Sequence, residues 1–373
     1  MPVAQSPILV AFNLFLLVCI VLLMRRARFY PFRVNPSFRK MSLFLSIIFV
    51  LFSFWGSDWF HYLELYPNLR NGYSTHMEDA YTFIAQRLSV GYISFRFTVW
   101  GTGLMLYYLL VKRLSVNTDL ALLFFLSIWL IWFSYARVSL AMVLVYLGVS
   151  LIYKPFKAKF LSYVIGLILI WASIFFHKTA LFAIIIVTIS ALGGLLNKKL
   201  AAFALPVLMF IIPFFISSFL SEFMTLDTSY DEDILDMSVK YGQYYLDEDG
   251  IAMGIGGMLQ RLLEMSPYYI LAITSYITLL RYEVQKDIAL FMRVLIIIVF
   301  ISSLLTLDYG LNTSVLYVRF MRFAFIPSSI VLAYMWSNNI YPKWTKATFY
   351  IAISGAFYAV LYSLYCSIMA PVL

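Results

Sequence analysis

Long apolar runs recur almost from one end of the chain to the other, and they constrain its fold more than any other feature. Of the 373 residues, 63% are hydrophobic and only 12% are charged, which is about half the charged fraction of a soluble protein. Runs of about 17 to 25 apolar residues can cross the hydrocarbon core of a bilayer as helices, because a helix satisfies its own backbone hydrogen bonds. The sequence therefore predicts an all-α, polytopic integral membrane protein and excludes a water-soluble one.

The apolar runs divide the chain into twelve expected transmembrane helices. They lie near 7–24, 41–56, 93–111, 119–134, 137–153, 160–176, 179–196, 200–220, 267–280, 288–306, 323–337 and 347–367. These runs leave no room for a separate soluble domain, so residues 1–373 are interpreted as a single transmembrane domain. The first run is followed, not preceded, by arginines, so we expect a retained span and not a cleaved signal peptide.

Lysine and arginine are distributed unevenly between the two sets of loops that these spans create. One set holds 17 of the 27 lysines and arginines but only three of the 18 acidic residues. Cytoplasmic loops of membrane proteins are enriched in Lys and Arg, so we assign that set to the cytoplasm and both termini to the outer side. This orientation accounts for the net charge of +9, and no nucleic-acid partner is expected.

Two larger loops, near 57–92 and 221–266, fall on the outer side. The first is rich in aromatic, acidic and amide residues, a mixture suited to holding sugars or polar headgroups, with an interfacial helix as the alternative. It contains the adjacent acids Glu78 and Asp79, which point in different directions on a helix, so that one of them is a candidate base or sugar ligand. In the second loop the run Gly254 to Gly257 lacks a following Lys-Ser/Thr, so a flexible turn is expected there and not a phosphate-binding loop.

Five basic side chains lie at the outer ends of expected helices, where charges are costly to place and therefore suggest function. They are Arg137, His177, Lys178, Arg319 and Arg322. If they converge, they need anionic groups nearby to offset their mutual repulsion. A lipid diphosphate suits the paired guanidinium groups of Arg319 and Arg322, which share a helix face. The alternatives are snorkelling of each arginine to the interface and a purely structural imidazole at His177.

Around these residues, over roughly 58–330, the chain resembles the EpsG-type branch of the Wzy-like bacterial polysaccharide polymerases. Arg137-Val138 with Ala141 is similar to the Arg-Gln helix start of that family, with valine in place of the glutamine. His177-Lys178-Thr179-Ala180 resembles its His-x-Ser/Thr-Ala sequence, and KYGQYYLDEDGIAMGIGG resembles its Tyr-rich, Gly-containing outer loop.

The resemblance implies a GT-C-like membrane glycosyltransferase that polymerises undecaprenyl-diphosphate-linked oligosaccharide repeat units on the outer face of the bacterial cytoplasmic membrane. It implies no nucleotide sugar, cofactor or metal. The partners would be the lipid-linked donor and acceptor and the bilayer, with a chain-length-regulating co-polymerase as a further candidate. The expected catalytic residues are Arg137, His177, Arg319 and Arg322; the expected substrate-binding residues are Lys178, Glu78, Asp79, Tyr241, Tyr244 and Arg261.

Two other functions stay open at this point. A transporter or flippase for lipid-linked glycans would also need cations, but along a central cavity, and only Arg293 lies within an expected span away from its ends. A membrane acyltransferase could use His177 as its base. That chemistry needs a cytoplasmic acyl donor, and the sequence offers no inward-facing histidine or acid cluster to receive it.

Overall fold

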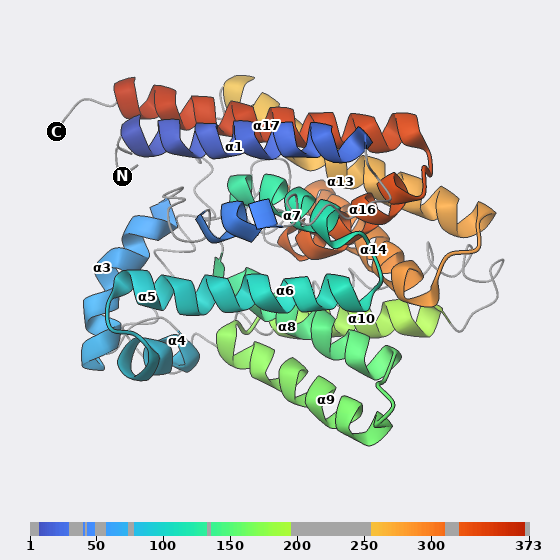
Figure 1. The fold of residues 1–373 in the computed structure, drawn as a ribbon, viewed down its shortest axis with the longest axis horizontal. Coiled ribbons are helices and arrows are strands. Elements are labelled where there is room, and N and C mark those ends of the chain that lie inside the picture. Colours follow the sequence, from blue (N-terminus) through green and yellow to red (C-terminus); the bar gives the residue numbers. More distant parts are fainter. Residues whose placement is uncertain are drawn as a thin grey trace.

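Every regular element in the described part of the chain is a helix, which confirms the all-α prediction. The computed structural model describes residues 7–29, 40–41, 43–48, 57–73, 78–132, 136–194, 255–309 and 321–369. The long helices run roughly along one direction, and α1 and α17 lie side by side on one edge of the bundle (Figure 1).

The helices follow the apolar runs of the sequence. The longer ones are α1 (Pro7–Phe29), α6 (Thr102–Arg113), α7 (Thr118–Trp132), α8 (Ala136–Tyr153), α9 (Lys159–Phe176), α10 (Ala180–Gly193), α13 (Ile255–Arg281), α14 (Lys286–Tyr309), α16 (Phe325–Ser337) and α17 (Pro342–Met369). The others are α3 (Ser57–Asn71), α4 (Asp79–Phe83), the π-helix η1 (Ile84–Leu88), α5 (Tyr92–Arg96), the π-helix η2 (Phe97–Gly101) and the 3₁₀-helix η4 (Arg322–Ala324). Because α5, η2 and α6 follow one another without a break, they match the expected span 93–111.

One helix in the described ranges, α9, is long and apolar enough by length and composition to cross a membrane. Three shorter apolar helical stretches accompany it, at Val10–Leu23, Leu140–Tyr153 and Ala180–Gly193. The expected span 200–220 and most of 41–56 lie outside the described residues. The number of twelve spans and the GT-C-like arrangement therefore stay predictions.

The expected flexible turn at Gly254–Gly257 is wrong from Ile255 onward, because α13 begins there and includes Gly256 and Gly257. The physical reason is packing against α17. A Cβ added at Gly355 of α17 would lie 3.1 Å from the carbonyl oxygen of Leu263, so the two helix backbones approach closely. Such tertiary contact outweighs the weak intrinsic helix propensity of glycine.

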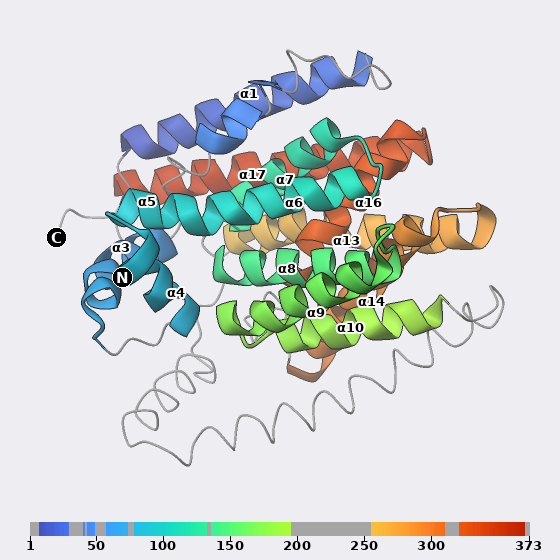
Figure 2. The same cartoon turned by 60° about the horizontal axis from the view of Figure 1, so that its bottom comes forward.

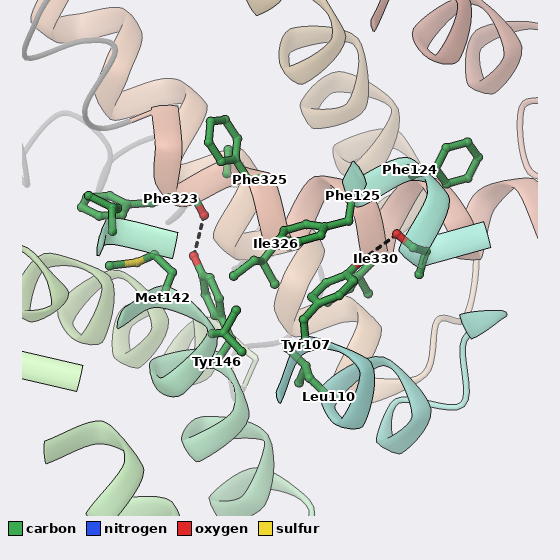
Figure 3. Packing of buried hydrophobic residues seen from close by; sticks show 14 of the residues in the cluster. Tyr107, Leu110, Phe124, Phe125, Met142, Tyr146, Phe323, Phe325, Ile326 and Ile330 are labelled. Carbon is green, nitrogen blue, oxygen red and sulfur yellow. Dashed lines mark hydrogen bonds between the residues drawn. The ribbon is translucent and has the colours of Figure 1, made fainter. Parts of the chain in front are cut away.

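Tyrosine hydroxyl groups join the central helices in a core that is otherwise apolar (Figure 3). The Tyr146 hydroxyl on α8 donates to the carbonyl oxygen of Phe323 in η4 at 2.7 Å. The Tyr107 hydroxyl on α6 donates to the Ala121 carbonyl at 2.9 Å and lies 2.6 Å from the Ser329 hydroxyl. Both phenols are fully buried, so these bonds satisfy polar groups that water cannot reach.

Several loops that the sequence analysis assigned to the cytoplasm meet at one end of the bundle, here called the lysine-rich end. Lys154 Nζ lies 2.9 Å from Asp287 Oδ2, and the rings of Tyr282 and Tyr341 are 5.9 Å apart. The opposite end is here called the α3–α4 end, and α1 begins and α17 ends at this same end of the bundle (Figure 1). Which end faces the cytoplasm is a prediction that rests on the charge distribution.

Arg293, the cation within an expected span, has a structural role in the packing of α10. Its Nε donates to the carbonyl oxygen of Ser190 at 2.8 Å, in the last turn of that helix. Carbonyl groups in the last turn lack intrahelical donors, and a cation near a helix C-terminus is favourable. The position of Arg293 is therefore explained without a transport pathway.

Gly148 on α8 and Gly166 on α9 bring these two antiparallel helices into backbone contact. A Cβ at Gly148 would lie 2.6 Å from the Gly166 carbonyl oxygen, and a Cβ at Gly166 would lie 2.8 Å from the Gly148 carbonyl oxygen. Small residues permit this approach in helical membrane proteins. The pair also fixes the register in which α8 lies against α9.

We expect Gly148→Ala and Gly166→Ala each to lower the free energy of unfolding by about 1–3 kcal/mol, because the obstructing atom is backbone and cannot move aside. The measurement is the apparent Tm of the purified protein in detergent. The matched control is Gly101→Ala, also within a helix, where an added Cβ meets only ordinary side-chain contacts at 3.5 Å. An unchanged Tm for both interface variants would contradict the close approach.

Candidate active site at the α3–α4 end

A compact polar turn at the α3–α4 end leads the chain from α4 and η1 into α5. The Ser94 hydroxyl accepts hydrogen bonds from the backbone N–H groups of Val90 and Gly91, at 2.8 and 3.1 Å. Arg70 at the end of α3 donates to the Val90 carbonyl at 3.1 Å. These contacts hold α3 against the segment between η1 and α5. Helix α4 packs against the end of α9.

The tyrosines of the segment 57–92 pack against one another, and most do not offer a surface for sugars. Tyr62, Tyr66, Tyr81 and Tyr92 are all buried. Tyr66 contacts Tyr92 and Phe95 edge-on or tilted, and Tyr81 meets Phe176 of α9 at 5.7 Å in a T-shaped arrangement. The expectation that aromatics of this loop hold sugar rings is wrong for these four. The preference of aromatic rings for edge-to-face packing explains why they gather here.

Arg96 is a buried cation in this aromatic cluster that the sequence analysis did not select. Its side chain is 1% exposed, and its guanidinium carbon lies 5.1 Å from the centre of the Trp100 ring. A desolvated cation over an indole face is a favourable arrangement. The signal that would have found it is the one used for Arg137, namely a cation at the outer end of an expected span. Its enclosure makes it a support for the turn at α5 and not a substrate ligand.

Glu78 and His177, which are 99 positions apart in the sequence, meet at the α3–α4 end. His177 Nδ1 lies 3.7 Å from Glu78 Oε1, and both side chains are mostly buried, with 21% and 16% exposed. The backbone N–H of Thr179 donates to the same Nδ1 at 3.3 Å, and the Thr179 hydroxyl is 3.2 Å away. All three groups approach the same ring nitrogen, Nδ1, which accepts the Thr179 N–H, so they fix the orientation of the imidazole, as a proton-transfer group requires. Two of the expected site residues are thus brought together.

An apolar cavity of about 470 Å³ begins beside this pair. Asp79 and Phe176, the chain neighbours of Glu78 and His177, both line it, and Leu140 of α8 closes its inner side. Ile84 and Leu88 of η1 and Thr98 of η2 line it as well, so two π-helical segments flank the cavity. Such segments are frequent at functional sites. The volume and the apolar lining with few polar groups are typical of ligand pockets.

The register of α8 against α9 puts position 137 and His177 at the same end of the two helices. Going from the Gly148–Gly166 contact toward the α3–α4 end, Arg137 is eleven residues along α8 and His177 is eleven residues along α9, or about 16 Å in each case. Because a helix turns about 100° per residue, position 137 lies on nearly the same face of α8 as Gly148 and opposite Tyr146. Backbone geometry therefore associates Arg137 with the His177 group.

Arg322 belongs to a different face of α8. It begins η4, whose Phe323 carbonyl is held by Tyr146, and its side chain is half-buried. By the same helical register, α8 lies between position 137 and η4. The expected gathering of the five basic residues stays a prediction, because the side chain of Arg137 and the whole of Arg319 lie outside the described part.

The remaining expected residues contribute less. Lys178 is exposed, directly after His177, and Asp79 is exposed at the cavity. Arg261 lies in α13, with its side chain outside the described part, and Tyr241 and Tyr244 lie outside the described residues. Within the ranges that the structure describes, no group of three or more His, Cys, Asp or Glu is arranged to hold a metal ion.

The helical fold and the site define a class, a helical protein with an apolar cavity next to a mostly buried acid–imidazole pair. Comparison with known proteins gives the family: the chain belongs to the EpsG family, whose model matches residues 35–370. EpsG is a Wzy-like polysaccharide polymerase family, and its members are membrane proteins. The resemblance found in the sequence is therefore confirmed. No curated protein and no solved structure matches the chain.

Proposed function

We propose that this protein polymerises undecaprenyl-diphosphate-linked oligosaccharide repeat units on the outer face of the bacterial cytoplasmic membrane. The observation that carries the proposal is the Glu78–His177 pair at the edge of an apolar cavity. A glycosyl transferase with a lipid-linked donor needs both a proton acceptor for a sugar hydroxyl and an apolar surface near it. Membership of a polysaccharide polymerase family supports the same conclusion.

In the proposed reaction, the hydroxyl oxygen of the acceptor glycan attacks the anomeric carbon of the donor glycan. The bond from that carbon to the diphosphate oxygen breaks, a new glycosidic bond forms, and the lipid diphosphate leaves. The hydroxyl proton passes to His177, where the Glu78 carboxylate stabilises the imidazolium that results. Charge develops on the leaving diphosphate, and fixed cations there lower the barrier by electrostatic preorganisation.

The cations proposed for the diphosphate are Arg137, by its register with His177, and the exposed Lys178 that follows the imidazole. Arg322, which begins η4, and Arg319, which lies outside the described residues, are proposed as candidates for a second lipid diphosphate, that of the acceptor. Asp79, at the cavity edge, is suited to accept hydrogen bonds from sugar hydroxyls. We propose that the loop 221–266, with Tyr241 and Tyr244, and Arg261 in α13 contribute to the choice of acceptor.

The test is incubation of the purified protein with lipid-linked repeat units, followed by separation of the glycans by size. A ladder of polymers with release of lipid diphosphate is the expected result. Movement of the lipid-linked glycan across a vesicle membrane without a ladder would identify a flippase. Transfer of an acyl group to single repeat units would identify an acyltransferase.

The orientation of the protein can be tested with single cysteines at two exposed lysine positions, after replacement of Cys19 and Cys366. We expect Lys178→Cys to react with a membrane-impermeant maleimide on intact cells, and Lys157→Cys to react only after permeabilisation. Both side chains are exposed in the structure, so access through the bilayer is the difference measured. Reaction of Lys157→Cys on intact cells would show that the orientation is the opposite of the one expected. It would also contradict the outer location of the proposed site.

A further inference from the structure

The apolar cavity at the α3–α4 end has two different borders. Groups of both charge signs lie at or near one border. Asp79 lines the cavity, Glu78 and His177 are the chain neighbours of the lining residues Asp79 and Phe176, and Lys178 follows His177. The other border consists of apolar side chains, chiefly Phe83 and Leu88, which are 57% and 56% exposed, and Phe175 of α9. A molecule that fits both borders has a hydrocarbon part and a head with anionic and hydroxyl groups.

The apolar border continues onto an exposed apolar face of α9. Leu167, Ile168, Trp171 and Phe175 on this helix are each 45% or more exposed, and α9 lies on the outside of the described bundle in both views (Figures 1 and 2). In a membrane protein such a face contacts lipid chains. Phe175 belongs both to this face and to the cavity lining, so exposed apolar side chains continue from α9 to the cavity.

The groups near the polar border suit a head that carries both phosphate and sugar. The carboxylates of Glu78 and Asp79 can accept hydrogen bonds from hydroxyl groups, and Lys178 can bind phosphate oxygens. A sugar-bearing diphosphate uses both signs, because cations bind its phosphate oxygens and carboxylates accept hydrogen bonds from sugar hydroxyls. Position 137 lies about 60° from Leu140 around the axis of α8 and about one turn nearer the α3–α4 end. The helical register therefore puts Arg137 on the same side of α8 as this lining residue.

We propose that this cavity holds the isoprenoid segment next to the diphosphate of the lipid-linked donor, which enters sideways from the bilayer over α9. The inference rests on the proposed function for the identity of the lipid. It adds the site, the entry route and the residues that determine chain recognition: Phe83, Ile84, Leu88, Thr98, Leu140 and Phe176. The diphosphate then lies between His177 and position 137, with the glycan directed away from the bilayer.

The first experiment uses the wild-type protein in nanodiscs with an isoprenyl diphosphate that carries a photoreactive group on its second isoprene unit and no sugar. We expect crosslinks to residues 80–102 and 175–176, with competition by unlabelled isoprenyl diphosphate and little by added phospholipid. Crosslinks confined to other helices would overturn the proposal. Equal competition by phospholipid would also overturn it, because the cavity would then be a general lipid contact.

The second experiment fills the cavity with Thr98→Phe. The matched control is Thr188→Phe on α10, because both threonine hydroxyls donate to the carbonyl four residues earlier at 2.8 Å and only Thr98 lines the cavity. We expect the probe to bind Thr98→Phe about tenfold more weakly, a loss of about 1.4 kcal/mol, and to bind the control as it binds wild type. Unchanged binding by Thr98→Phe, with wild-type folding, would overturn the proposal.

These measurements involve no catalysis, so they separate the two proposals. Binding at the cavity by a protein that forms no polymer would refute the proposed reaction and leave the isoprenoid site standing. Polymer formation with crosslinks elsewhere would refute the isoprenoid site alone.

Discussion

Replacement of His177 with alanine is expected to lower the rate of polymer formation by about a hundredfold to ten-thousandfold, the usual contribution of a positioned general base. The imidazole follows Phe176, which lines the cavity, and its orientation is fixed by Glu78 and Thr179, so it is placed to accept a hydroxyl proton. The measurement is the initial rate of ladder formation by purified enzyme at a saturating concentration of lipid-linked repeat units.

The partner variant Glu78→Gln tests the pair itself. It retains the shape of the side chain but removes the charge that stabilises the imidazolium, so we expect a smaller loss than for His177→Ala. The matched control is Asp287→Asn, which removes the acid of the exposed ion pair with Lys154 at the lysine-rich end. Equal activity of Glu78→Gln and Asp287→Asn would show that the Glu78–His177 contact has no catalytic role. Wild-type activity of His177→Ala would remove His177 from the site.

A charge-conserving change of Arg137 to lysine is expected to lower polymer formation by about a hundredfold, or about 3 kcal/mol of transition-state stabilisation. Lysine keeps the charge but lacks the planar fork that binds two phosphate oxygens at once. An arginine that merely snorkels to the membrane interface would tolerate the change. Each variant is compared at matched membrane abundance, so that a folding defect is not mistaken for lost catalysis.

Arg319→Lys and Arg322→Lys extend this test to the other two arginines of the expected site. If these arginines bind the acceptor lipid, their variants are expected to lose activity to a similar degree. The control is Arg281→Lys, which changes an exposed arginine at the opposite end of α13 from Ile255. Near-normal polymer formation by all three site variants would contradict any arginine clamp on diphosphate. A loss at Arg319 and Arg322 alone would make Arg137 an interfacial anchor.

The sequence determined the class of protein because the relevant signals are local. Apolar runs of bilayer length and the spacing of charges between them predict helices at nearly the observed bounds, as for α9 at 160–176 and Lys159–Phe176. Three short motifs, namely Arg137-Val138 with Ala141, His177-Lys178-Thr179-Ala180 and the Tyr-rich outer loop, together indicated the family that the comparison confirms. Each of these signals can be read from the sequence without knowing which helices touch.

Only the tertiary structure decided which of the candidate residues act together. The Glu78–His177 contact joins residues far apart in the chain, and the backbone contact of Gly148 with Gly166 sets the register that associates position 137 with His177. Likewise, Tyr62 and Tyr81 are aromatic residues of a loop that the sequence analysis interpreted as suited to holding sugars. In the structure both are buried by packing against other aromatic rings. The residue type determines the chemistry that a side chain can perform, whereas helix packing determines which side chains it contacts. A functional site depends on both.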